Sequence, residues 1–186
     1  TGGWDDKGKF GFKHTVTLYL IKGDTIRNPV NVLPAFQDNY RYQGSIQIDS
    51  MINPFRFKLR PGENYAKLRT IITGHEQEGE FSPINFHVKL NGKAIYQKRL
   101  WKTDCDQNPI QPQSGTWIFS RTNWCPGEKV NEIEVHLADL KIEGENEVEI
   151  YFGKIETESK EIHAVYSIES HVITYRYKDS FDVALI

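Results

Sequence analysis

Alternation of apolar and polar residues, interrupted by Pro, Gly and Asn, is the feature that most constrains how this 186-residue chain can fold. Side chains of a strand point alternately to its two faces, so a period of two marks strands with one buried face. The alternating or strand-like runs are Phe10–Leu20, Phe55–Leu59, Leu68–Thr73, Ile84–Leu90, Lys93–Leu100, Ile133–Leu137, Glu147–Phe152 and His163–Tyr175. No stretch favours a helix. We therefore predict an all-β fold, an antiparallel jelly-roll β-sandwich.

The clearest local signal is the dipeptide Asn91-Gly92, which separates two of these runs. Both residue types tolerate the positive φ angles of a type I′ turn, whose twist matches that of paired strands. We expect residues 84–90 and 93–100 to form one hairpin.

The stretch from Gly23 to Ser50 is rich in Pro and Asn and breaks the alternation. We interpret it as a linker packed along the surface. Residues 1–43 are then the end of an upstream domain plus this linker, including an N-terminal strand remnant of an upstream jelly roll. Residues 44–186 form a complete C-terminal sandwich. The alternative is a long excursion inside a single sandwich.

Charge and hydropathy exclude some classes of partner. The formal net charge is −2, so the chain has no electrostatic footprint for nucleic acid. The longest apolar runs, such as Val16–Ile21, are far too short to span a bilayer. We expect neither a nucleic-acid partner nor a membrane span.

The chain has two cysteines, Cys105 and Cys125. Two cysteines without histidines at matching spacing do not make a zinc site, so we predict no metal and one disulfide. A disulfide implies an oxidising location, namely secreted, periplasmic or at the cell surface. The alternative is a pair of buried free thiols in a cytosolic protein.

Several segments resemble the C-terminal half of the bacterial peptide-N-glycosidase F family. The most specific is the cysteine-bounded loop Cys105–Gly127, CDQNPIQPQSGTWIFSRTNWCPG. Tyr65–His75, Phe86–Gly92 and the last strand from Ala164 are also similar. The resemblance covers roughly residues 50–175 and extends weakly to Trp4 near the start.

The resemblance implies two jelly rolls packed side by side, with the active site in the cleft between them. It implies hydrolysis of the amide bond between an asparagine side chain and the first N-acetylglucosamine of an N-glycan, without metal or cofactor. The essential aspartate belongs to the upstream jelly roll, supported by two glutamates. The motif that carries this aspartate is not found in the sequence, and Gly2 stands where one of the glutamates is expected. This chain by itself is therefore expected to be inactive.

By the same resemblance, Glu80 is the catalytic carboxylate, and Arg121, Trp4, His75 and Trp124 are substrate-binding residues. An amide hydrolase needs a carboxylate to position water and donors for the developing oxyanion. Simpler interpretations are a solvated loop glutamate for Glu80 and a surface ion pair for Arg121. Trp4 could instead lie in a domain interface, and Trp124 could pack against the disulfide.

We therefore expect part of a peptide-N4-(N-acetyl-β-glucosaminyl)asparagine amidase that acts on glycoproteins with an upstream jelly-roll domain or chain. The main alternative is a non-catalytic glycan-binding or structural module. A remote alternative is a copper-dependent monooxygenase of the same fold superfamily, which would need clustered histidines and a methionine thioether. The chain has one methionine, Met51, and no His-x-His pair.

Overall fold

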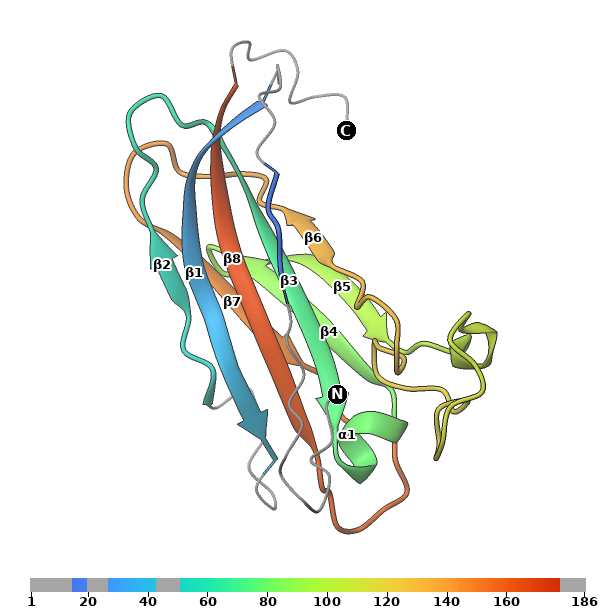
Figure 1. The fold of residues 1–186 in the computed structure, drawn as a ribbon. Helices are drawn as coiled ribbons and strands as arrows, with labels where there is room; N and C mark the ends of the chain where they lie inside the picture. The colour runs from blue at the N-terminus through green and yellow to red at the C-terminus, as the bar shows by residue number, and fades with distance from the viewer. Residues whose placement is uncertain (1–14, 20–26, 43–50, 178–186) are drawn as a thin grey trace, which may run out of the picture.

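The computed structural model describes residues 15–19, 27–42 and 51–177, and the described part is built of two four-stranded sheets packed face to face (Figure 1). The first sheet has the order β1 (Arg27–Arg41), β8 (Val165–Tyr177), β3 (Tyr65–His75), β6 (Ile133–His136). The second has the order β2 (Phe55–Phe57), β7 (Asn146–Phe152), β4 (Ile84–Leu90), β5 (Lys93–Leu100). All pairings between these strands are antiparallel. The predicted all-β jelly-roll sandwich is confirmed.

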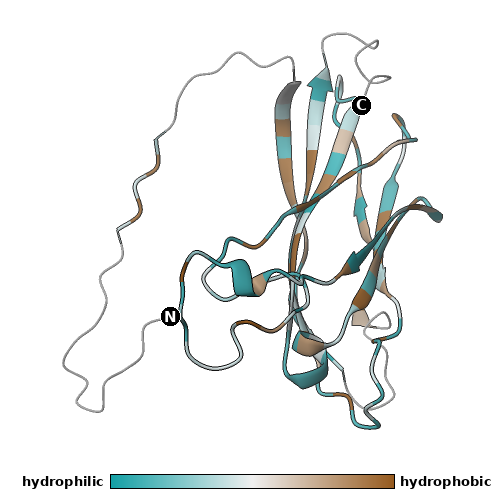
Figure 2. Cartoon of the chain, turned by 90° about the vertical axis from the view of Figure 1, so that its right-hand side faces the viewer, coloured by the Kyte–Doolittle hydropathy of each residue, from teal (hydrophilic) through white to brown (hydrophobic). Residues whose placement is uncertain are grey.

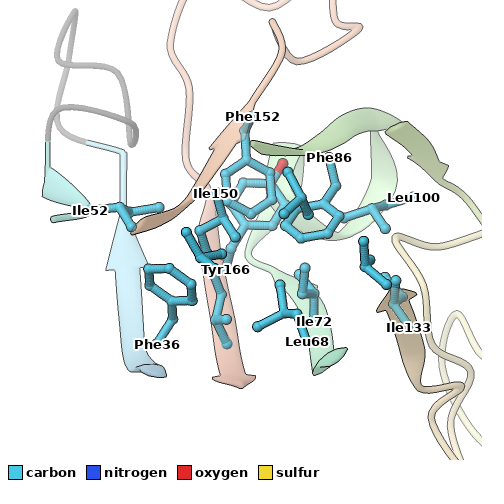
Figure 3. Close-up of a cluster of buried hydrophobic side chains, with 14 of the residues drawn as sticks. Phe36, Ile52, Leu68, Ile72, Phe86, Leu100, Ile133, Ile150, Phe152 and Tyr166 are labelled. Carbon is cyan, nitrogen blue, oxygen red and sulfur yellow. The ribbon is translucent and has the colours of Figure 1, made fainter. Parts of the chain in front are cut away.

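The core lies between the two sheets and is filled by the apolar phase of the alternating strands. In β4 every second residue is buried, and Figure 2 shows hydrophobic and hydrophilic bands alternating along the strands. Full burial of one such side chain contributes about 1.5–3 kcal/mol. Figure 3 shows side chains of both sheets, and Ile52 from the segment before β2, meeting in this core. The labelled strand residues are Phe36, Leu68, Ile72, Phe86, Leu100, Ile133, Ile150, Phe152 and Tyr166.

The predicted hairpin is confirmed. Leu90 pairs with Lys93, and the two turn residues Asn91 and Gly92 have φ angles of 50° and 81°. The Asn91 amide also donates to Asn146 Oδ1 at 3.1 Å, which ties the turn to the start of β7.

The predicted linker is wrong for residues 27–41, which form the long strand β1. It pairs with β8 from Arg27↔Tyr177 to Arg41↔Val165. Its register shifts near Pro29 and between Pro34 and Gln37. Proline is tolerated on edge strands and at bulges because it has no N–H to donate, and β1 is an edge strand. The prolines therefore mark irregularities within a strand and not the absence of one.

The sequence prediction also missed a one-turn helix, α1 (Gln77–Phe81), directly after β3. Glu76 before it has a φ of 65°, which turns the chain out of the strand. Gly79 allows α1 to pack closely, since a Cβ there would lie 3.0 Å from backbone atoms of Ala164 and Val165. A short 3₁₀ turn, η2 (Cys105–Gln107), opens the cysteine-bounded loop.

The described part of the predicted N-terminal strand, residues 15–19, is not a strand in this structure. Val16 and Leu18 are 81% and 83% exposed. Trp4 and Gly2 lie outside the described residues. In the part of the chain that the structure describes, no helix has the length and apolar character to cross a membrane.

Candidate active site

Glu80 lies on α1, at the end of the sandwich where β3 finishes. The helix is held to the sandwich on two sides. The Glu78 carboxylate accepts the His163 N–H at 2.7 Å, and the Glu80 carbonyl accepts the Thr122 N–H at 2.9 Å. The position of the Glu80 side chain is therefore set by contacts from two segments distant in sequence.

The Glu80 carboxylate forms an ion pair with Nη1 of Arg121. The Arg121 side chain is only 4% exposed, and that of Glu80 is 19% exposed. Arg121 Nη2 donates to the Thr116 carbonyl at 2.5 Å and to its hydroxyl at 3.0 Å. The guanidinium is therefore fixed from both ends. Pairing keeps a buried charge tolerable, since an unpaired ion in a protein interior costs several kcal/mol.

Two aromatic rings lie within cation–π distance of the guanidinium. Arg121 Cζ lies 5.0 Å from the ring centre of Phe81 and 5.1 Å from that of Trp124. The Trp124 ring centre is 5.4 Å from that of His75, and its indole N–H donates to the Gly74 carbonyl at 2.8 Å. Cation–π contacts of this kind contribute about 0.5–2 kcal/mol when partly desolvated.

The predicted disulfide between Cys105 and Cys125 is present and closes the loop that carries Arg121. Two ion pairs also hold the base of the loop. Lys102 Nζ lies 2.8 Å from the Asp104 carboxylate and 3.0 Å from that of Glu128. The hydrogen bond from Lys102 holds the pKa of the Asp104 carboxyl below its usual range.

Burial shifts two ionisable groups of the site. It lowers the pKa of His75 below 6.5, so the imidazole is neutral at pH 7. The His75 Nε2 lies 2.8 Å from the Thr73 hydroxyl. Burial also lowers the pKa of Arg121, but an arginine starts so high that it stays charged at neutral pH.

Four of the five residues expected from the sequence, Glu80, Arg121, His75 and Trp124, are brought together here, and Trp4 lies outside the described residues. Arg121, expected to bind substrate, spends both terminal nitrogens on Glu80 and Thr116. Sequence reasoning missed Thr116, because a threonine five residues before an arginine in a loop carries no recognisable signal. It also missed Phe81, Glu78 and their helix. Among the described residues, no cluster of three or more His, Cys, Asp or Glu could hold a metal ion.

The chain is thus of the jelly-roll sandwich class. Its disulfide-closed loop places Arg121 against Glu80, close to the end of β3. A family model described as "Peptide-N-glycosidase F, C terminal" matches residues 42–172. The chain belongs to this family.

Three solved structures illustrate the similarity. Recombinant peptide N-glycanase F is 25% identical with a TM-score of 0.64, covering 79% of this chain and 52% of its own. PNGase F from Flavobacterium meningosepticum, described as a glycosylasparaginase, is 24% identical with a TM-score of 0.64, covering 80% and 52%. PNGF-II is 24% identical with a TM-score of 0.57, covering 78% and 30%. The chain thus spans about half the length of PNGase F. A search of curated proteins finds no match.

Proposed function

We propose that this chain is the C-terminal half of an N-glycan amidase that releases N-glycans from glycoproteins together with an upstream jelly-roll domain. The observation that carries the proposal is the Glu80–Arg121 pair, placed by a family-type cysteine loop at one end of the sandwich. One of the family's solved structures is described as a peptide-N4-(N-acetyl-β-D-glucosaminyl)asparagine amidase.

In the proposed reaction, water adds to the asparagine side-chain amide that carries the first N-acetylglucosamine. The C–N bond breaks, the sugar leaves as a glycosylamine, and the asparagine becomes aspartate. Glu80 would orient the water or the amide, since its carboxylate is fixed and partly exposed. Arg121 would act through Glu80 by orienting its carboxylate, because the Arg121 side chain is itself buried.

An upstream partner is supported by residues 15–19, whose apolar side chains are exposed and which belong to neither described sheet. In the proposed arrangement, residues 1 to about 22 complete the upstream jelly roll, which supplies the essential aspartate. Trp4 would lie near the cleft between the domains and contact the glycan. The disulfide supports a location outside the cytoplasm, where such bridges persist.

The test is incubation of a defined N-glycopeptide with this chain alone and with the upstream domain added. Mass spectrometry follows conversion of the glycosylated asparagine to aspartate. Conversion only in the mixture supports the proposal. Conversion by this chain alone would show that a carboxylate outside the proposed upstream domain does the chemistry.

A non-catalytic glycan-binding module is the second candidate. It is favoured by Gly2 at the position where a supporting glutamate is expected. This candidate predicts saturable binding of chitobiose-type sugars with no conversion in either arm of the experiment.

A further inference from the structure

A hollow is lined by residues at the start of β3, which is the end of the sandwich opposite α1. It is a hollow of about 300 Å³, within the size range of small-ligand pockets. Its walls come from the start of β3, the end of β8 and the loop after β6. The main lining residues are Asn64, Tyr65, His136, Leu140, Ile142 and Tyr177.

Part of the wall of the hollow is aromatic. The Tyr65 and Tyr177 rings meet nearly at right angles, with centres 5.0 Å apart. The Tyr65 hydroxyl is hydrogen-bonded to Nδ1 of His136. On the rim, Ile142 is 59% exposed and offers an apolar surface to a ligand. Among the described residues, the hollow is thus bounded by packed aromatic rings on one side and by the exposed Ile142 on another.

Polar groups on the wall are mixed in kind and close to neutral in charge. Asn64 uses its carbonyl oxygen to accept the Tyr177 N–H at 2.9 Å, which leaves its amide nitrogen as a donor for a ligand. Asp139 offers acceptor oxygens, and its charge is offset by Lys93 Nζ at 3.0 Å. Among the described lining residues, the one carboxylate, that of Asp139, is paired, so this wall does not select for a fully charged ligand.

We infer that this hollow binds a neutral pyranose unit, such as one hexose or N-acetylhexosamine of a glycan. A pyranose ring combines an apolar C–H face, which fits Leu140 and Ile142, with hydroxyls that suit Asn64, His136 and Asp139. The eleven residues of β3 rise about 3.3 Å each, which puts roughly 30 Å between this site and His75. The site therefore holds a sugar remote from Glu80. The inference does not depend on hydrolysis.

The test is a nuclear magnetic resonance titration of the ¹⁵N-labelled chain with N-acetylglucosamine, chitobiose and methyl mannoside. We expect saturable shifts of the amides at 64–65 and 136–142 for at least one sugar, in the millimolar range. Glycerol, which has hydroxyls but no ring face, should not cause saturable chemical-shift changes at these amides. Shifts confined to residues 74–81 and 121–124, or no saturable shift, would overturn the inference.

Two variants keep the fold while changing the hollow. Asn64→Asp retains the acceptor for Tyr177 and removes the donor, and Ile142→Ser removes the exposed apolar surface. Each should weaken sugar binding about tenfold or more. Ile118→Ser, at a similarly exposed isoleucine on the cysteine loop, is the matched control and should leave binding unchanged. Equal loss in Ile142→Ser and Ile118→Ser would refute a site at this end.

Discussion

At the scale of single residues, the centre of the candidate site is one ion pair. Arg121 is buried, clamped by Thr116 and two aromatic rings, and its charge is balanced by Glu80. Breaking one partner of a buried pair leaves the other uncompensated, which costs more than the pair itself contributes. Glu80 is thus tied to stability as well as to the proposed chemistry.

Replacing the carboxylate alone should therefore destabilise the fold. Glu80→Gln is expected to lower the free energy of unfolding by about 3–5 kcal/mol, because it strands the Arg121 charge. Urea denaturation followed by tryptophan fluorescence measures the change. The matched control is Glu156→Gln, which breaks an exposed pair with Arg99 and should cost no more than about 1 kcal/mol. Similar losses in both variants would show that burial of the Arg121 pair has no special energetic weight.

His75 gives the site a defined pH response. Burial lowers the pKa of His75 in the folded state below the ordinary 6.5. At pH values between the folded-state and unfolded-state pKa, the unfolded chain therefore binds more protons than the folded chain. Stability supplied by neutral His75 is full above pH 6.5 and is lost as pH falls through the folded-state pKa. Titration of the His75 ring proton signals should give a pKa below 6.5. In His75→Gln, this part of the acid-induced loss of unfolding free energy should vanish, and a pKa at or above 6.5 would contradict the argument.

At the scale of elements, the disulfide-closed loop Cys105–Cys125 positions Arg121 against α1. The disulfide closes a segment with a sequence separation of 20, which by the chain-entropy model stabilises by about 3 kcal/mol. The double variant Cys105→Ser/Cys125→Ser should lose that amount in urea unfolding. Reduction of the unaltered protein should lower the midpoint similarly. An unchanged midpoint after reduction would mean that Lys102 and its carboxylate partners alone hold the loop base.

The close packing of α1 against β3 depends on Gly74. A Cβ at this position would lie 1.9 Å from the Gly79 carbonyl oxygen and 2.8 Å from the Thr122 Cβ. Gly74→Ala must therefore push α1 and Glu80 away from β3, at a cost of about 1–3 kcal/mol or more. Gly153→Ala is the control, since its nearest contact would be an ordinary 3.4 Å, and it should stay within about 0.5 kcal/mol. Thermal unfolding of both variants measures whether the packing of α1 against β3 tolerates an added methyl group at Gly74.

What the sequence could predict follows from the range of the forces involved. Strands 84–90 and 93–100 were predictable, because alternation and an Asn-Gly turn act locally. Strand β1 was not, because its prolines suggest a linker unless its edge position is known. Helix α1 has five residues and is held by the tertiary contact between Glu78 and His163, so no periodicity reveals it.

The candidate site divides in the same way. Family resemblance supplied Glu80 and Arg121, but not that the two side chains, which lie far apart in the sequence, form an ion pair with each other. Thr116 and Phe81 contribute only through three-dimensional packing around Arg121, which neither spacing nor residue type discloses.

At the scale of the whole molecule, one rigid core separates two ends with different chemistry. The α1 end carries a fixed carboxylate, and the far end carries the aromatic hollow at Tyr65. The strands β3 and β8 run between them in continuous register from Tyr65↔Tyr175 to His75↔Val165. The two ends can therefore be altered independently, because mutations this far apart usually have additive effects.

Residues 15–19 provide a test of where the boundary of the sandwich domain lies. Val16 and Leu18 are more than four-fifths exposed, so the double variant Val16→Asp/Leu18→Asp should change the unfolding free energy of this chain by less than about 0.5 kcal/mol. In a longer protein that includes the proposed upstream jelly roll, the same variant should lower stability by several kcal/mol, because it would place two charges in that domain's core. Thr17→Asp is the control, because in the proposed upstream strand its side chain would point away from the core side of Val16 and Leu18. Calorimetric unfolding of both lengths measures the contrast, and a large loss in this chain alone would assign residues 15–19 to the sandwich described here.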